Sequence, residues 1–205
     1  MENTAPTKAN LMAAQSTLEF SQKGFELLDK KRNVLIREMM SYMTRVRNLQ
    51  ERINTTFREA YLALQKANVT IGVNNVKNIA LAIPAAKDFE IMHHSVMGVE
   101  VPEVKYEREE VKPTYGLFRS NSAIDEAVIK FNEVKYLTYE LAEVENAVYK
   151  LALEVKKTQK RANALQNIQI PKYKELVKTI SDVLDEKDRE EFFRLKVVKK
   201  KNKVY

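Results

Sequence analysis

A heptad repeat in the first third of the chain restricts its fold more than any other feature. With Leu11 taken as position a, thirteen of the sixteen core positions up to Ala63 hold an apolar residue or Tyr. The a positions are Leu11, Leu18, Phe25, Arg32, Met39, Val46, Ile53 and Ala60, and the d positions are Ala14, Ser21, Leu28, Leu35, Tyr42, Leu49, Thr56 and Ala63. This spacing is typical of a coiled-coil helix. A helix of about 60 residues would be roughly 90 Å long.

A second heptad repeat occupies the last third of the chain, and ten of its twelve core positions are apolar. Its a positions are Ala127, Val134, Leu141, Val148, Val155 and Ala162, and its d positions are Lys130, Leu137, Val144, Leu151, Thr158 and Leu165. Pro171 then interrupts the pattern, which resumes at Tyr173. Because proline removes one backbone donor, we expect a kink here rather than the end of the helix.

Helix-breaking residues cluster between the two repeats, at Gly72, Pro84, Gly98, Pro102, Pro113 and Gly116. We therefore divide the chain into an N-terminal coiled-coil helix (1–67), a central broken segment with a short helix and a β-hairpin (68–121), and a C-terminal coiled-coil helix with a protruding tip (122–205). The predicted fold class is all-α, a long antiparallel two-helix coiled coil with a small central β-hairpin region. Four glycines in total are too few for the turns of a compact α/β fold.

Capping residues mark where each long helix begins. Thr7 is placed to cap the first helix, and either Asn121 or Ser122 is placed to cap the second. In the central segment, apolar residues from Phe89 to Val101 alternate with other residues, which predicts a pair of strands near 88–102. Since two strands alone are marginally stable, we expect this hairpin to rest on the helices or on a partner.

The polar core positions suggest how the two helices align. If the numbers of paired residues sum to 190, Arg32 faces Thr158, and apolar layers face one another elsewhere. A shift of one heptad would place Arg32 opposite a leucine, and burying a charge against Leu is costly. The alignment also places Thr7 beside Val183, so that residues 184–205 have no partner helix within the chain.

The unpaired end combines apolar and basic residues. Phe192, Phe193, Leu195, Val197 and Val198 would be exposed there, which indicates a surface that receives them rather than a frayed terminus. The same end is rich in basic residues, namely Arg194, Lys196, Lys199, Lys200, Lys201 and Lys203. Cations at the C-terminal end of a helix interact favourably with the helix dipole, so these residues are also typical of a solvated helix end. Aromatic residues are not interleaved with them, which argues against the binding of nucleic acid.

The residue types needed for catalysis are scarce. The chain has no Cys, and its two His are His93 and His94. Because neighbouring side chains point in different directions, this pair is poorly placed to bind one metal ion. The glycines are too dispersed for a phosphate-binding loop. The acidic run from Asp185 to Glu191 is typical of a solvated helix face. We therefore expect no catalytic, cofactor or metal site, and no apolar window reaches the length of a membrane span.

Several segments resemble the D subunit of V-type and A-type rotary ATPases. The most specific is the stretch TQKRANAL at 158–165 followed by Ile170-Pro171, and the stretch EEFFRLK at 190–196 is also similar. Met97-Gly98-Val99-Glu100-Val101-Pro102 resembles the centre of that family. The resemblance covers nearly the whole chain.

This resemblance implies a function that the heptads alone do not. It predicts a central rotor shaft that transmits torque between a ring of catalytic and regulatory subunits and the membrane rotor. Phe192, Phe193, Arg194, Leu195 and Lys196 would lie in the bearing of the catalytic ring. The residues that would face the F subunit and the membrane-rotor adaptor subunit are Met97, Gly98, Val99 and Val101. The protein itself would be non-catalytic, peripheral and on the cytoplasmic face of the membrane, with no nucleic acid among its partners.

Two alternatives also use a helical hairpin. A prefoldin-like chaperone has β-hairpins between its helices, but its helices are usually shorter and it does not account for the 158–171 and 190–196 segments. A coiled-coil scaffold, or a protein that binds nucleic acid through the basic end, is the second alternative.

Overall fold

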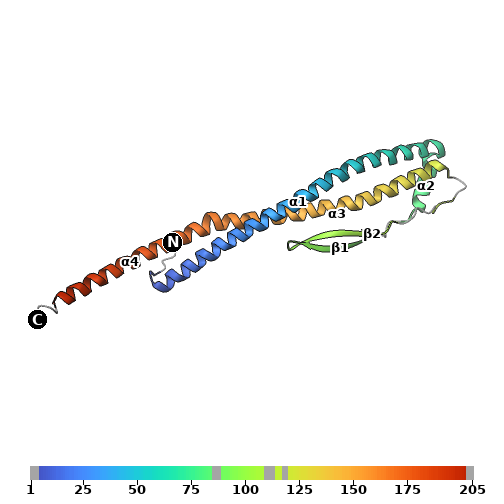
Figure 1. Ribbon diagram of the computed structural model, residues 1–205. Coiled ribbons are helices and arrows are strands. Elements are labelled where there is room, and N and C mark those ends of the chain that lie inside the picture. The colour runs from blue at the N-terminus through green and yellow to red at the C-terminus, as the bar shows by residue number, and fades with distance from the viewer. Residues whose placement is uncertain (1–4, 85–88, 109–113, 117–119, 202–205) are drawn as a thin grey trace. The chain divides into compact units, whose positions relative to one another are not determined.

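A computed structural model describes all residues except 1–4, 85–88, 109–113, 117–119 and 202–205. Its elements are α1 (Lys8–Ile71), α2 (Val73–Ala82), β1 (Phe89–Val96), β2 (Val99–Tyr106), α3 (Ser122–Ala164), the π-helical turn η2 (Leu165–Gln169) and α4 (Ile170–Lys201) (Figure 1). This confirms the predicted fold class of long helices with a small β-hairpin. None of the helices in the described part of the chain combines the length and apolar character that crossing a membrane requires.

The chain divides into two compact units, which are described separately. One contains Met1–Asn33 and Val155–Tyr205, and the other contains Val34–Glu154. The core of the Val34–Glu154 unit is formed by α1 and α3, which lie side by side there (Figure 1). Its buried members are Leu49, Ile53, Leu137 and Val144, and the partly buried Tyr42, Val46, Phe57 and Leu141 pack against them.

Burial along α1 follows the predicted heptads. Every buried side chain of this helix lies at position a or d, and these are Ala14, Ser21, Leu35, Leu49, Ile53, Ala60, Ala63 and Ala67. On α3, most of the buried residues also occupy predicted core positions. Ile124, Tyr136 and Ala147 are buried outside them. The heptad pattern therefore predicts most of the buried residues of α3 and misses these three.

Contacts between the helices confirm the predicted alignment in each unit. In the Val34–Glu154 unit, Lys130 Nζ lies 2.7 Å from Glu59 Oε2, so the one charged d position of α3 reaches an acidic partner. The bond from Asn121 Nδ2 to Thr70 Oγ1 is 3.0 Å long. The two pairs of residue numbers sum to 189 and 191.

The other unit has the same alignment. A Cβ placed on Gly24 would lie 3.7 Å from Leu165 Cδ1, and these two residue numbers sum to 189. The polar core position Arg32 pairs with Asp29 of its own helix, at 2.6 Å between Nη2 and Oδ1. Thr158 is buried, with 2% of its surface exposed.

Both predicted N-caps are present. Thr7 Oγ1 accepts a hydrogen bond from the Asn10 amide at 3.3 Å, and Asn121 Oδ1 accepts one from the Ala123 amide at 2.9 Å. We expect Asn121→Ala to lower the free energy of unfolding by about 1 to 2 kcal/mol, because it removes this cap and the bond to Thr70 together. Urea unfolding followed by circular dichroism measures the change. Asn121→Ser, which keeps a capping oxygen, should lose less than half as much; equal losses would contradict the capping role.

Pro171 leaves the helix continuous but changes its local winding. The five residues before Ile170 form the π-helical turn, in which the Ile170 amide bonds to the Leu165 carbonyl. Proline has no amide to donate and its ring collides with the carbonyl four residues earlier. A π-helical turn widens the helix at this point, so α4 continues to Lys201.

The C-terminal helix α4 extends beyond the position where α1 begins, as predicted (Figure 1). Ile180 is the last buried residue of α4, with 2% of its surface exposed. From Asp185 to Lys201 every residue is exposed. This overhang is therefore helical and without a partner within the described chain.

The predicted hairpin is present and longer than expected. β1 and β2 pair antiparallel from Phe89 with Tyr106 to Val96 with Val99, and the turn residues Met97 and Gly98 have φ of 52° and 79°. Two positive φ values match a two-residue type I′ turn. The sequence prediction ended near Pro102, but β2 continues through it because proline costs a strand nothing where its amide would point away from the partner strand.

Candidate partner-binding surfaces

The first candidate surface is the exposed tip of α4, defined as residues 192–201. Phe193 and Leu195 expose 66% and 67% of their surfaces, and Phe192, Val197 and Val198 are also more than half exposed. Five large apolar side chains on an unpaired helix form a surface that a partner would cover at a free-energy gain. The structure thus leaves the predicted bearing residues open to contact.

Charged groups surround these apolar side chains. Lys196 Nζ lies 4.6 Å from the centre of the Phe192 ring and 5.9 Å from that of Phe193. Arg194 Nη2 lies 3.7 Å from Glu190 Oε2, one turn earlier. Lys199, Lys200 and Lys201 form the last turn, where cations suit the helix dipole. Lys203, which the sequence groups with them, lies outside the described residues.

The second candidate surface is the β-hairpin, which is fastened to α3. Glu143 Oε2 accepts a hydrogen bond from the Val104 amide at 2.9 Å, and Glu140 Oε1 accepts one from Tyr106 Oη at 2.8 Å. Burial and the neighbouring Glu140 carboxylate raise the pKa of Tyr106. Arg108 Nη2 lies 3.6 Å from Glu140 Oε1. Bonds to carboxylates are among the stronger hydrogen bonds in proteins, so they hold the hairpin firmly.

Aromatic rings complete this attachment. The rings of Tyr106 and Tyr136 stack with their centres 5.2 Å apart, and those of Phe89 and Tyr139 lie 5.1 Å apart. Such pairs add to the free energy gained by burial alone. Sequence reasoning missed this attachment site. Tyr136, Tyr139, Glu140 and Glu143 recur at helical spacing on α3, but polar and aromatic residues outside the core positions look like a solvated face.

The predicted hairpin residues occupy different environments. Met97 and Gly98 form the turn, and Met97 exposes 48% of its surface. Val99 is half-buried, and Val101 is fully buried. The turn can therefore contact a partner directly, whereas Val101 packs within the chain and would act by supporting the hairpin.

We expect Glu143→Ala to loosen the hairpin. The Val104 amide would lose its acceptor, so its hydrogen exchange should become roughly tenfold faster, as expected for the loss of about 1.4 kcal/mol. Glu143→Gln keeps an acceptor oxygen and should lie between Ala and the native residue. Exchange measured at Val104 tests this, with the amide of Val101 as the internal reference. An unchanged rate at Val104 in Glu143→Ala would show that the carboxylate does not hold the strand.

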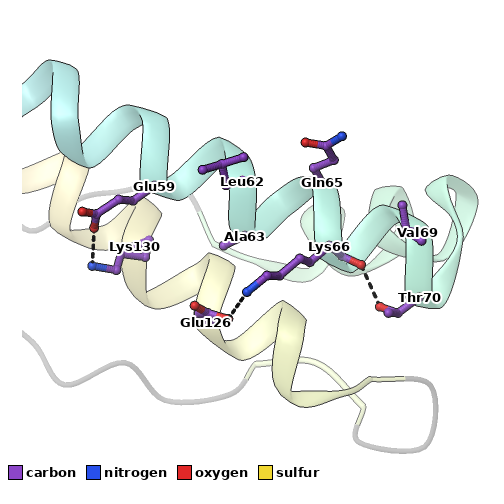
Figure 2. A pocket seen from close by; sticks show the side chains of 9 residues that line it. All are labelled: Glu59, Leu62, Ala63, Gln65, Lys66, Val69, Thr70, Glu126 and Lys130. Carbon is purple, nitrogen blue, oxygen red and sulfur yellow. Dashed lines mark hydrogen bonds and ion pairs between the residues drawn. The ribbon is translucent and has the colours of Figure 1, made fainter.

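A shallow groove of about 550 Å³ lies along α1 and α3 in the Val34–Glu154 unit (Figure 2). It is crossed by the ion pairs of Lys130 with Glu59 and of Lys66 with Glu126, at 2.7 and 3.9 Å. Leu62 and Gln65 point away from α3 (Figure 2). The lining carboxylates are paired with lysines, and Glu59 raises the pKa of Lys130 by accepting its hydrogen bond. The charged groups of this groove thus pair with one another between α1 and α3.

The two histidines lie next to each other on β1 and face opposite sides of the strand. His93 pairs with Pro102 and His94 with Val101, and His94 Nδ1 is 4.0 Å from Glu103 Oε2. Among the described residues, no three His, Cys, Asp or Glu side chains gather closely enough to hold a metal ion.

The described chain is a helical hairpin with an exposed helix tip and a β-hairpin that is bonded to α3. The family model described as the ATP synthase D subunit matches residues 10–200. The chain belongs to this family.

Curated relatives agree over nearly their whole lengths. The V-type ATP synthase D subunit of Thermotoga neapolitana is 45% identical over 199 residues, which cover 97% of this chain and 98% of the relative. The A-type ATP synthase D subunit of Thermococcus kodakarensis is 36% identical, with 96% and 94% covered, and that of Pyrococcus furiosus is 35% identical, with 95% and 92% covered. The chaperone and scaffold alternatives receive no support from these relatives.

Proposed function

We propose that this chain is the central-stalk rotor subunit of a V/A-type rotary ATPase. It transmits torque between the ring that hydrolyses or synthesises ATP and the rotor that moves ions across the membrane. The observation that carries the proposal is family membership over nearly the full chain, joined to paired helices that end in an exposed tip. Two helices packed side by side resist bending and twisting better than one, which suits a shaft.

The exposed tip is the part proposed to enter the catalytic ring. Phe192, Phe193 and Leu195 supply an apolar surface, and Arg194 and Lys196 lie among them. A bearing needs contact without tight directional bonds, because each bond must break as the shaft turns. Exposed apolar side chains satisfy this need, since the hydrophobic effect is not directional.

The hairpin is the part proposed to face the F subunit and the membrane-rotor adaptor subunit. Met97 and Gly98 are exposed at its turn, Val99 lies beside them, and Val101 supports the strand from within. The fastening to Glu140 and Glu143 supports this role, because a hairpin fixed to α3 would turn with the shaft.

The chain is proposed to be non-catalytic and to lie at the cytoplasmic face of the membrane through its partners. Co-purification of the tagged full chain from its own cells tests the whole proposal. It should recover nucleotide-binding ring subunits and a small partner of the F-subunit type in fixed ratio. Recovery of the chain alone, or with a hexameric chaperone, would contradict the rotor assignment.

A further inference from the structure

One edge of the β-hairpin has no partner within the described residues. A two-stranded sheet has two outer edges, and the outer edge of β2 faces α3, where the Val104 amide reaches Glu143. The outer edge of β1 is left open, and six of its eight residues are exposed. Each outward amide and carbonyl on an open edge is free to pair with another strand.

The pairing register shows which amides point outward. Val96 and Val99 flank a two-residue turn, so they form a hydrogen-bonded pair, and hydrogen-bonded pairs then alternate along the ladder. Val104 falls on an outward position by this rule, which agrees with its bond to Glu143. On β1 the outward positions are Phe89, Ile91, His93 and Ser95. Among the described residues, no hydrogen bond reaches their backbone groups.

This edge lacks the usual features that prevent strand pairing. Proteins protect open edges with Lys, Pro, bulges or short strands. β1 is eight residues long, contains no Lys or Pro and pairs with β2 without a bulge. Its one acidic residue is Glu90, and Ile91 and Met92 expose 61% and 44% of their surfaces. The opposite strand carries Pro102 on an outward position, so protection is present on β2 and missing on β1.

We propose that the outer edge of β1 binds an extended strand of another subunit of the same ATP synthase, which adds a third strand to the hairpin. Repeating donors and acceptors at strand spacing fit an extended backbone and no other common element. The added strand carries apolar side chains that cover Phe89 and Ile91 on one face and Met92 on the other. A second copy of this chain is the other possible occupant, and the experiment below distinguishes it. The inference rests on the proposed function for its partner and on the hairpin geometry for its chemistry.

Hydrogen exchange of single amides tests the proposal. The full chain is measured alone and in the assembly recovered after co-expression with the other subunits of the ATPase. The outward amides of Ile91, His93 and Ser95 should exchange rapidly in the free chain and at least about tenfold more slowly in the assembly. The inward amides of Met92 and His94 should already be protected in the free chain.

A matched pair of variants isolates the backbone. His93→Pro removes an outward donor without breaking a bond to β2, whereas His93→Ala removes the same imidazole and keeps the donor. His93→Pro should weaken binding of the subunit that protects this edge by about tenfold, and His93→Ala by less than about twofold. Equal effects of the two variants would contradict strand addition.

The remaining outcomes are distinguishable. An assembly that forms while the outward amides stay unprotected overturns the strand proposal and leaves the rotor function intact. Failure to recover any assembly overturns the rotor function and, with it, the proposed partner. Protection that appears in the free chain as its concentration rises shows that a second copy occupies the edge, and this also overturns the proposal.

Discussion

Val144→Asp should unfold the Val34–Glu154 unit far more readily than a substitution on its surface. Val144 is fully buried among Leu49, Ile53 and Leu137, where a carboxylate would have neither water nor a partner. Burying an unpaired ionisable group in such a site costs about 4 kcal/mol or more, whether the group stays charged or takes up a proton. Urea unfolding followed by circular dichroism should therefore show a large shift of the midpoint to lower urea.

Leu153→Asp provides the matched control for this prediction. Leu153 lies on the same helix, loses a side chain of similar character and exposes 50% of its surface. A carboxylate there remains in water, so the free energy of unfolding should change by less than about 1 kcal/mol. Similar losses in the two variants would mean that the heptad core does not determine the stability of this unit.

Removal of residues 190–205 should abolish most of the binding to the catalytic ring while leaving the helices folded. The deletion takes away the five exposed apolar side chains of the tip, and covering them contributes about 3 kcal/mol even if each is only partly buried by the ring. Affinity for the ring should fall roughly a hundredfold, and ATP hydrolysis should become uncoupled from ion movement. Because every described residue from 190 to 201 is exposed, the remaining helical content should be unchanged.

A shorter deletion separates the apolar contribution from the basic one. Removing 199–205 leaves the side chains from Phe192 to Val198 in place and takes away Lys199, Lys200, Lys201 and Lys203. Binding should stay within about fivefold of the full chain at moderate salt, because charges on an exposed surface are screened. A general loss of helicity in either deletion would show that the overhang is part of the folded core and that the helix alignment is wrong.

Much of the fold follows from periodicity. Residues such as Leu49 and Val144 recur at heptad spacing, and this spacing alone places them on the buried face of a helix. The alignment of the helices follows from the polar core position Arg32, which faces Thr158 in one alignment and would face a leucine after a shift of one heptad. The overhang then follows from this alignment, which places Thr7 beside Val183 and leaves residues 184–205 without a partner helix.

The attachment of the hairpin could not be predicted in the same way. Tyr136 and Glu143 look like solvated residues of a helix, and their role depends on a strand that arrives from elsewhere in the chain. The end of β2 was missed because Pro102 signals a break in sequence, and only the pairing register shows that its position needs no donor. Such contacts between distant segments have no local period to reveal them.

The central claim, that this chain is a shaft that turns, is tested most directly by watching it turn. Because the chain has no Cys, Leu81→Cys, at a position with 85% of its surface exposed, provides a single site for a bead. With the catalytic ring fixed to a surface, ATP should drive the bead in one direction, and the rotation should stop when ATP is removed. A ring that hydrolyses ATP steadily while the bead on a firmly bound chain stays still would contradict the account.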